Sequence, residues 1–228
     1  MARFALRPGW LLCGLILAAL AVWGGLFAAR IGRQRAARDH VERLGGRVVE
    51  IRIAPEWLRE RLPEDWLWPF DSIEQVDLSY SRLADVDVPE LVARLEPLPD
   101  LRSVYLAGTD VGDSSAADLA RLTRLRALVL TGTGVTDEGL LRIAPLDRLE
   151  WLALGGTGVT DRGLRHLAAF PRLEVLDLDG TEVSDEGIGA LASLRHLNEL
   201  SVANTGVTET ALRELGAAMP SLLSVWDD

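Results

Sequence analysis

The sequence predicts an α/β solenoid, in which short coils stack side by side and share one hydrophobic core. Five consecutive segments align without gaps from residue 101 onward, four of 24 residues and a last one of 25. Each segment begins with a leucine, and a further leucine follows the last: Leu101, Leu125, Leu149, Leu173, Leu197 and Leu222. A repeat of this period indicates stacked coils, because a single coil cannot bury its own apolar edge. We therefore expect a parallel β-sheet on the concave side and short helices on the convex side.

The first half of each coil predicts a short strand and a sharp turn. Leu125, Leu128 and Leu130 recur at a spacing that places them on the buried face of a strand. Gly132 follows, and the matching positions hold only glycine or asparagine, namely Gly108, Gly156, Gly180 and Asn204. These two residue types adopt left-handed backbone angles at little cost, so a turn is required there.

The second half of each coil predicts a short helix. We expect the hydroxyl of Thr133, which recurs in every coil, to satisfy turn backbone groups along the stack. Thr136 and Asp137 are predicted to cap the helix. Gly139 keeps the start of the helix thin enough for the next coil to stack, and Pro145 ends the helix.

These coils resemble the leucine-rich repeat, whose pattern is L-x-x-L-x-L, then a turn and T-D-x-G-L. The resemblance covers about residues 48–228, with a degenerate copy from Ile73 and a weaker one from Val48 that places Leu58 in a later repeat position. The N-terminal part resembles bacterial single-anchor repeat proteins, through residues 4–7 (FALR) and the Leu-Gly-Gly at residues 44–46. The resemblance implies a leucine-rich-repeat solenoid and implies no enzymatic activity.

Residues 9–29 predict a single transmembrane helix. They carry no charge, and 21 residues form a helix of about 31 Å, which matches the hydrocarbon core of a bilayer. A cleaved signal peptide is the alternative, but its apolar stretch is normally shorter and ends at a small-x-small site. Arginines lie on both sides of the segment, so the membrane side of the repeats stays open. We expect a single-pass protein of the bacterial inner membrane.

The chain thus divides into five predicted segments. They are an N-terminal tail (1–8), the transmembrane helix (9–29), a basic juxtamembrane helix (30–46), an N-terminal cap with the first strand (47–72) and the repeats (73–228). Four aromatic residues in the cap are predicted to cover the exposed end of the core: Trp57, Trp66, Trp68 and Phe70. At the other end we expect Leu222 and Val225 to start a last strand, whose edge the acidic Asp227 blunts.

Composition excludes several functions. All 24 basic residues are arginine and 34 residues are acidic, so a nucleic-acid partner is not expected. The absence of lysine removes the lysine-dependent sites of NTPases, protein kinases and Schiff-base enzymes. One cysteine and three scattered histidines offer no metal cluster. We therefore predict no catalytic residues, no metal, no cofactor and no small-molecule substrate.

One surface of the predicted solenoid stands out. Side chains alternate along a strand, so Tyr105, Val129 and Trp151 are expected to be neighbours on the concave sheet face. Aromatic residues beside arginine and acidic residues are typical of a protein-binding hot spot, although bulky residues also simply suit strands. The candidate partner-binding residues are Arg102, Tyr105, Arg126, Val129, Trp151 and Asp177.

The sequence therefore predicts a non-catalytic, membrane-anchored leucine-rich-repeat protein that binds a protein partner through its concave face. The identity of that partner is not encoded in any motif. The alternative is a structural, envelope-associated spacer whose repeats hold distance or self-associate. An enzyme is disfavoured, because no acid–base pair or nucleophile motif is present.

Overall fold

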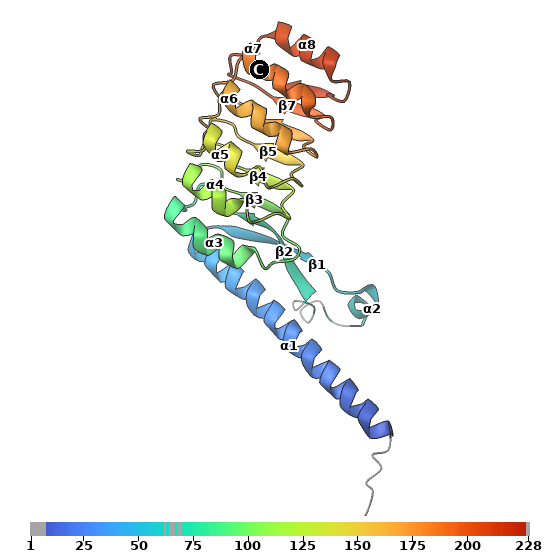
Figure 1. The fold of residues 1–228 in the computed structure, drawn as a ribbon. Coiled ribbons are helices and arrows are strands. Elements are labelled where there is room, and N and C mark those ends of the chain that lie inside the picture. Colours follow the sequence, from blue (N-terminus) through green and yellow to red (C-terminus); the bar gives the residue numbers. More distant parts are fainter. Residues whose placement is uncertain (1–7, 62, 64–66, 68–69, 227–228) are drawn as a thin grey trace, which may run out of the picture.

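The computed structural model of the chain describes residues 8–61, 63, 67 and 70–226, without the side chains of residues 8–20 and Arg52 (Figure 1). Its strands form one sheet of eight strands in the order β1 to β8. They are β1 (Arg47–Arg52), β2 (Asp71–Asp77), β3 (Ser103–Tyr105), β4 (Ala127–Val129), β5 (Trp151–Ala153), β6 (Val175–Asp177), β7 (Glu199–Ser201) and β8 (Ser224–Trp226). Strands β2 to β8 are parallel, as the repeat predicts.

Short helices stack along the other side of the sheet (Figure 1). The α-helices are α1 (Pro8–Arg43), α2 (Glu56–Arg59), α3 (Val88–Leu95), α4 (Asp113–Leu119), α5 (Asp137–Arg142), α6 (Asp161–Leu164), α7 (Asp185–Ile188) and α8 (Glu209–Ala218). Within the described residues, the 3₁₀ turns that accompany them are η3 (Asp85–Asp87), η4 (Arg165–Ala169) and η5 (Gly189–Ser193). The predicted α/β solenoid of stacked strand–helix coils is confirmed.

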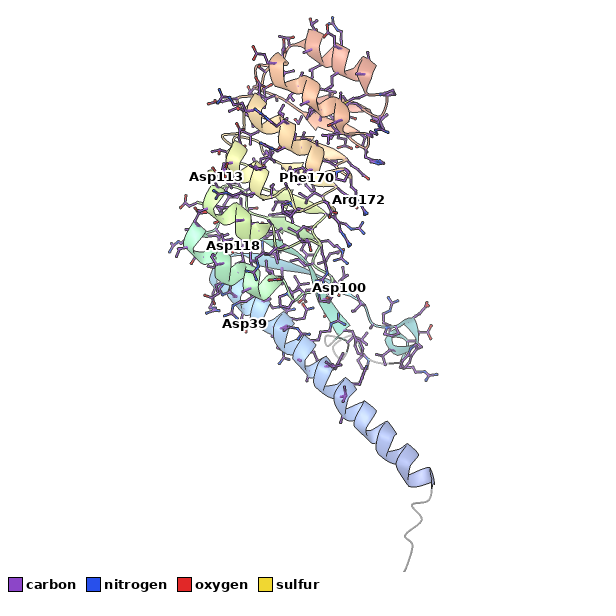
Figure 2. All side chains as sticks on the ribbon, viewed as in Figure 1. Asp39, Asp100, Asp113, Asp118, Phe170 and Arg172 are labelled. Atoms are coloured by element: carbon purple, nitrogen blue, oxygen red, sulfur yellow. The ribbon has the colours of Figure 1, made fainter. Side chains whose placement is uncertain are left out.

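The repeated leucines form one continuous core between the sheet and the helices. Leu125, Leu128 and Leu152 are at most 1% exposed, and the core runs without interruption from helix α1 to Met219. Phe170 is also fully buried; it lies between the helices and the sheet (Figure 2). Each coil contributes a few leucines, and the neighbouring coils complete their burial.

The turn after each strand has the predicted backbone. Gly132 has a φ of +67°, and the matching residue Asn204 has a φ of +55°. The threonine that follows behaves differently from the prediction. Thr133 Oγ1 donates to the carbonyl of Leu130 at 2.6 Å, so the hydroxyl closes the turn of its own coil and forms no ladder between coils. A hydroxyl this close in sequence reaches the local carbonyl first.

Aspartates at the helix starts link each coil to the next one. Of the two residues predicted to cap the helix, only Thr136 does so: its Oγ1 accepts a hydrogen bond from the backbone N–H of Glu138. Asp137 instead accepts from the backbone N–H and the hydroxyl of Thr160 in the following coil, both at 2.8 Å. The same pair of bonds, at 2.6–2.9 Å, joins Asp113 to Thr136, Asp161 to Ser184 and Asp185 to Thr208. This row of bonds is the aspartate ladder.

Replacing one ladder aspartate is expected to destabilise the fold. In Asp137→Ala, the N–H and hydroxyl of Thr160 lose a charged acceptor, which costs about 1–3 kcal/mol in the free energy of unfolding. Urea denaturation measures the change. Asp147→Ala, at an exposed position on the same coil, is the matched control. Equal losses for the two variants would show that the ladder contributes nothing.

The first strand differs from the prediction. Strand β1 pairs with β2 antiparallel, so the segment from Val48 is not a repeat coil. The reason is the Leu-Gly-Gly turn that ends α1. Gly45 has a φ of +86° and its N–H donates to Glu42, while the N–H of Gly46 donates to Val41 at 2.9 Å. These paired bonds are the usual glycine-dependent helix ending, which reverses the chain before β1.

Helix α1 covers the N-terminal end of the core, where the sequence predicts an aromatic lid. Ala37 and Val41 of α1 are fully buried in the core cluster. Trp57 is 60% exposed on α2, which has no buried residue and lies away from the coils (Figure 1). Trp66 and Trp68 lie outside the described residues, and Phe70 contacts Phe27 of α1, with ring centroids 5.4 Å apart. The lid prediction is therefore wrong for Trp57, because a helix with a small-residue face packs closer to the core end.

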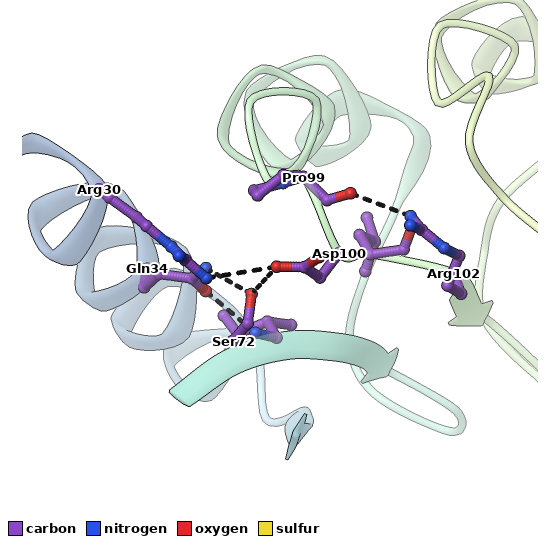
Figure 3. A network of polar contacts seen from close by, with 8 residues as sticks. Arg30, Gln34, Ser72, Pro99, Asp100 and Arg102 are labelled. Atoms are coloured by element: carbon purple, nitrogen blue, oxygen red, sulfur yellow. Dashed lines mark hydrogen bonds and ion pairs between the residues drawn. The ribbon is translucent and has the colours of Figure 1, made fainter. Parts of the chain in front are cut away.

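A buried polar network fixes α1 to the first coil (Figure 3). The side chain of Gln34 donates to Ser72 Oγ at 3.0 Å and accepts from the backbone N–H of Ile73 at 3.1 Å. Ser72 Oγ donates to Asp100 at 2.6 Å, and Arg30 pairs with the same carboxylate at 3.3 Å. Buried polar groups must be paired to avoid a desolvation penalty, so this network specifies one docked position of the helix.

Acidification is expected to weaken the docking of α1. Burial lowers the pKa of His40 below 6.5, and Arg94 and Arg43 add to the lowering against opposition from Glu90 and Asp87. Below pH 6.5 the unfolded chain therefore takes up a proton that the folded His40 resists, so stability falls as the pH drops from 6.5 towards the lowered pKa.

The urea midpoint of the full chain between pH 7.5 and pH 5.5 measures this loss. His40→Gln should flatten the pH dependence over this range, since it removes the titrating group. His196→Gln, at an exposed position, should leave the dependence unchanged. A slope that survives His40→Gln would assign the effect to other groups.

Helix α1 runs without a break from Pro8 through the predicted transmembrane segment and ends at Arg43, before the predicted end of the juxtamembrane helix at residue 46. In the part of the chain whose side chains are described, no helix is long and apolar enough to cross a membrane. The predicted span, residues 9–29, begins with residues whose side chains lie outside that part. Asp227, predicted to blunt the last strand, also lies outside the described residues, while Leu222 and Val225 pack partly buried against the core.

Candidate partner-binding face

The solvent side of the sheet presents two rows of side chains across the coils. One row follows the third position of each coil, where Ser103, Ala127, Trp151 and Val175 lie side by side in register. The other follows the fifth position, from Tyr105 through Val129 and Ala153 to Asp177. This surface is here called the open sheet face. Burial alternates as predicted on β3, β6 and β7, whereas Ala127 on β4 and Ala153 on β5 are buried although they lie in these rows.

Tyr105 and Trp151 meet on this face although strand β4 lies between their strands. Their ring centroids are 5.7 Å apart and their planes are inclined by 65°, an edge-to-face contact. The two rings meet across the strand of Ala127, which is only 7% exposed. A small residue on β4 therefore lets two large rings from β3 and β5 pack together. With Val129 they form the aromatic patch.

The two predicted arginines lie at the edge of the aromatic patch, and both have partners. Arg126 pairs with Glu150 at 3.1 Å. Arg102 donates to the backbone carbonyls of Pro99 and Leu101, each at 3.0 Å. Both guanidinium groups therefore already have partners within the chain.

An open groove of about 440 Å³ runs along this edge of the sheet. Its lining combines two arginines, two glutamates and the rim of the aromatic patch: Glu74, Arg102, Ser103, Arg126, Ala127, Glu150 and Trp151. Trp151 is 39% exposed, so its ring forms one wall of the groove while it contacts Tyr105. The groove crosses the four strands β2 to β5 and is open to solvent.

Beyond Trp151 the face becomes acidic. Glu174 and Glu199 are exposed and Asp177 is half-buried, all on or beside β6 and β7. These three residues are the acidic patch. Burial raises the pKa of Asp177; the hydrogen bond from the backbone N–H of Asp179, at 2.9 Å, opposes the rise, and the Asp179 carboxylate adds to it.

The structure brings all six predicted residues onto one face. The aromatic pair, Val129 and Asp177 lie on adjacent strands, and the arginines immediately precede β3 and β4. The sequence reasoning missed the pairing of Arg126 with Glu150. The sequence contains a signal for this pair, because Arg126 and Glu150 occupy the same repeat position in successive coils, where side chains are cross-strand neighbours. It also passed over Glu199, which occupies the same repeat position as Trp151.

The titratable side chains do not gather into a chemical centre. Among the described residues, no three His, Cys, Asp or Glu side chains are placed to hold a metal ion together. Asp177 and Asp179 accept hydrogen bonds from turn backbone groups, and Asp185 serves the aspartate ladder. The carboxylates of this segment therefore have structural partners within the repeat.

Comparison with known proteins identifies the repeat. A family model described as "Leucine Rich repeat" matches residues 122–144 and 172–192. A search of curated protein sequences found no match.

Similar solved structures include internalin C2 of Listeria monocytogenes, with 20% identity, 68% of this chain and 81% of that chain covered, and a TM-score of 0.48. A repeat protein of Leptospira interrogans has 19% identity, 66% and 36% coverage, and a TM-score of 0.49. The ectodomain of the Arabidopsis receptor kinase HAESA, solved with a peptide hormone, has 21% identity, 68% and 26% coverage, and a TM-score of 0.48.

Proposed function

We propose that this chain, which carries leucine-rich repeats, binds a partner protein through its open sheet face. The observation that carries the proposal is the aromatic patch. Tyr105 and Trp151 contact each other across Ala127, and Trp151 keeps 39% of its surface exposed beside the groove. Packed aromatic rings bordered by charged residues give a large contact area with little conformational entropy to lose on binding.

Replacing both rings is expected to abolish partner binding without unfolding the chain. The variant Tyr105→Ser/Trp151→Ser removes a half-buried and an exposed side chain of the sheet face and leaves the buried Val104 of β3 and Leu152 of β5 in place. Cross-linking of the purified full chain to membranes, followed by identification of the captured proteins, compares it with the parent chain. The control is Tyr80→Ser/Trp57→Ser, since Tyr80 is 83% and Trp57 60% exposed away from β3–β6. Capture that persists in the first variant would remove this face from consideration.

We further propose that the N-terminal part of α1 anchors the protein in a membrane. The uncharged stretch of residues 9–29 supports the proposal. Within it, Val22, Trp23 and Leu26 are 61–66% exposed, so an apolar part of the helix is not covered by the rest of the chain. Flotation of the full chain with lipid vesicles tests the anchor, and Leu26→Arg with Val22→Arg is expected to reduce it.

Self-association is a second candidate function, in line with a structural or envelope-associated spacer. It is favoured by the last strand of the sheet, where Leu223 is 82% and Trp226 64% exposed. Sedimentation of the full chain in detergent over a range of concentrations tests this role. A Leu223→Ser/Trp226→Ser variant is expected to remain monomeric where the parent chain associates; a parent chain that is monomeric throughout would exclude the spacer role.

A further inference from the structure

We infer that the partner segment bound by the open sheet face is an extended basic peptide, with an apolar residue on the aromatic patch and arginine or lysine side chains on the acidic patch. The inference rests on the proposed function and specifies the chemistry of the partner. It follows from which charges on the face are already paired.

The two arginine side chains beside the aromatic patch already have partners within the chain. Arg126 pairs with Glu150, and Arg102 donates to two backbone carbonyls. The acidic patch has no such compensation: among the described residues, no arginine or histidine pairs with Glu174, Asp177 or Glu199. The face therefore presents an uncompensated negative charge on β6 and β7.

The opposite side of the solenoid has a different charge pattern. The helices carry arginine–glutamate pairs four residues apart, at 2.6–3.2 Å, in Glu90–Arg94, Glu138–Arg142 and Glu209–Arg213. Part of the acidic charge of α3, α5 and α8 is thus paired with arginine, whereas the described residues form no such pair at the acidic patch. Charge complementarity favours a cationic ligand there.

The arrangement of rings and carboxylates also suits the side chains of such a peptide. Trp151 lies next to Val175, and Val175 lies next to Glu199 in the same row, so the ring and Glu199 are two strands apart, or about 10 Å. A guanidinium or ammonium group between them can contact the face of an exposed indole and a carboxylate together. Burial, together with the nearby Asp179 carboxylate, raises the pKa of Asp177, and a cation bound beside Asp177 would favour its charged form.

The course of the groove across the strands suits an extended chain. The groove crosses the strands from Glu74 to Trp151, and the acidic patch continues in the same direction across β6 and β7. Strands are spaced about 4.8 Å apart, and side chains on one side of an extended peptide recur about every 6.5–7 Å. A peptide of six to eight residues therefore spans the aromatic and acidic patches.

Fluorescence anisotropy with the full chain in a non-ionic detergent tests the inference. The probe is a labelled peptide with one leucine followed by alternating alanine and arginine, and its counterpart carries glutamate in place of arginine. We expect the arginine peptide to bind and the glutamate peptide not to bind. Glu174→Gln/Glu199→Gln should weaken binding about tenfold, and added salt should weaken it further.

The control variant Glu182→Gln/Glu186→Gln removes the same charge from exposed positions beside α7. It should change the affinity by less than twofold. Equal weakening by both double variants would reduce the effect to overall charge and overturn the inference. If the arginine peptide fails to bind while capture still depends on Tyr105 and Trp151, the inference falls and the proposed function stands. If the arginine peptide fails to bind and capture does not depend on Tyr105 and Trp151, both the inference and the proposed function are overturned.

Discussion

Ala37→Asp is expected to release α1 from the end of the solenoid and to lower the free energy of unfolding by on the order of 3 kcal/mol. Ala37 is fully buried in the hydrophobic core cluster, so the new carboxylate enters an apolar site that is closed to water. The full loss includes exposure of the first coil, which α1 otherwise shields. Urea denaturation of the full chain in detergent measures the change.

Gly32→Asp is the matched control on the same helix. Gly32 is exposed, and a Cβ at this position would have no heavy atom within 4 Å. The same new charge there should change the unfolding free energy by less than about 1 kcal/mol. Similar losses in the two variants would mean that α1 is not part of the folded core.

Leu152→Ala is expected to destabilise the protein by about 2–5 kcal/mol, because it leaves a cavity in the middle of the stack. Leu152 is fully buried on β5, with coils on both sides. The loss should appear as a lower urea midpoint of the full chain. Leu141→Ala removes the same atoms from α5, where the side chain is 45% exposed, and should cost less than about 1 kcal/mol. A cost for Leu152→Ala no larger than that of the control would contradict a shared core.

The repeated part of the fold could be predicted almost completely from the sequence. A leucine every 24 residues fixes which strand positions face the core, and the glycine or asparagine after each strand fixes the turn. Both are local constraints that recur in every coil. The role of Asp137 was assigned to its own helix, because a capping signal looks the same whether the aspartate serves its own coil or the next.

The N-terminal end could not be predicted in the same way, because it is not a repeat. The four aromatic residues of the cap were the strongest apolar signal, yet Ala37 and Val41 of an otherwise polar helical segment bury at this end. Alanine gives no pattern in the sequence that distinguishes a packing face from an exposed one. The role of Gln34 was not visible in the sequence either, because its two hydrogen bonds reach residues nearly forty positions away along the chain.

The candidate face was predictable as a set of positions and not as a charge distribution. Strand alternation placed Tyr105 and Trp151 on one surface, and the structure adds that a small Ala127 lets the rings touch. Counting arginines and acids in the sequence suggested a mixed surface. The pairing of Arg126 with Glu150 leaves the remaining carboxylates dominant, which depends on side-chain geometry.

The unbroken course of α1 has a mechanical consequence. Its 36 residues make a rod of about 54 Å, and the coils clamp only the part from Phe27 onward. A continuous helix has no hinge between the turns that pack against the coils and the turns that do not. A force that tilts or rotates the free turns of α1 therefore rotates the whole stack of coils. The sheet keeps a fixed orientation relative to any structure that holds the N-terminal end of the helix.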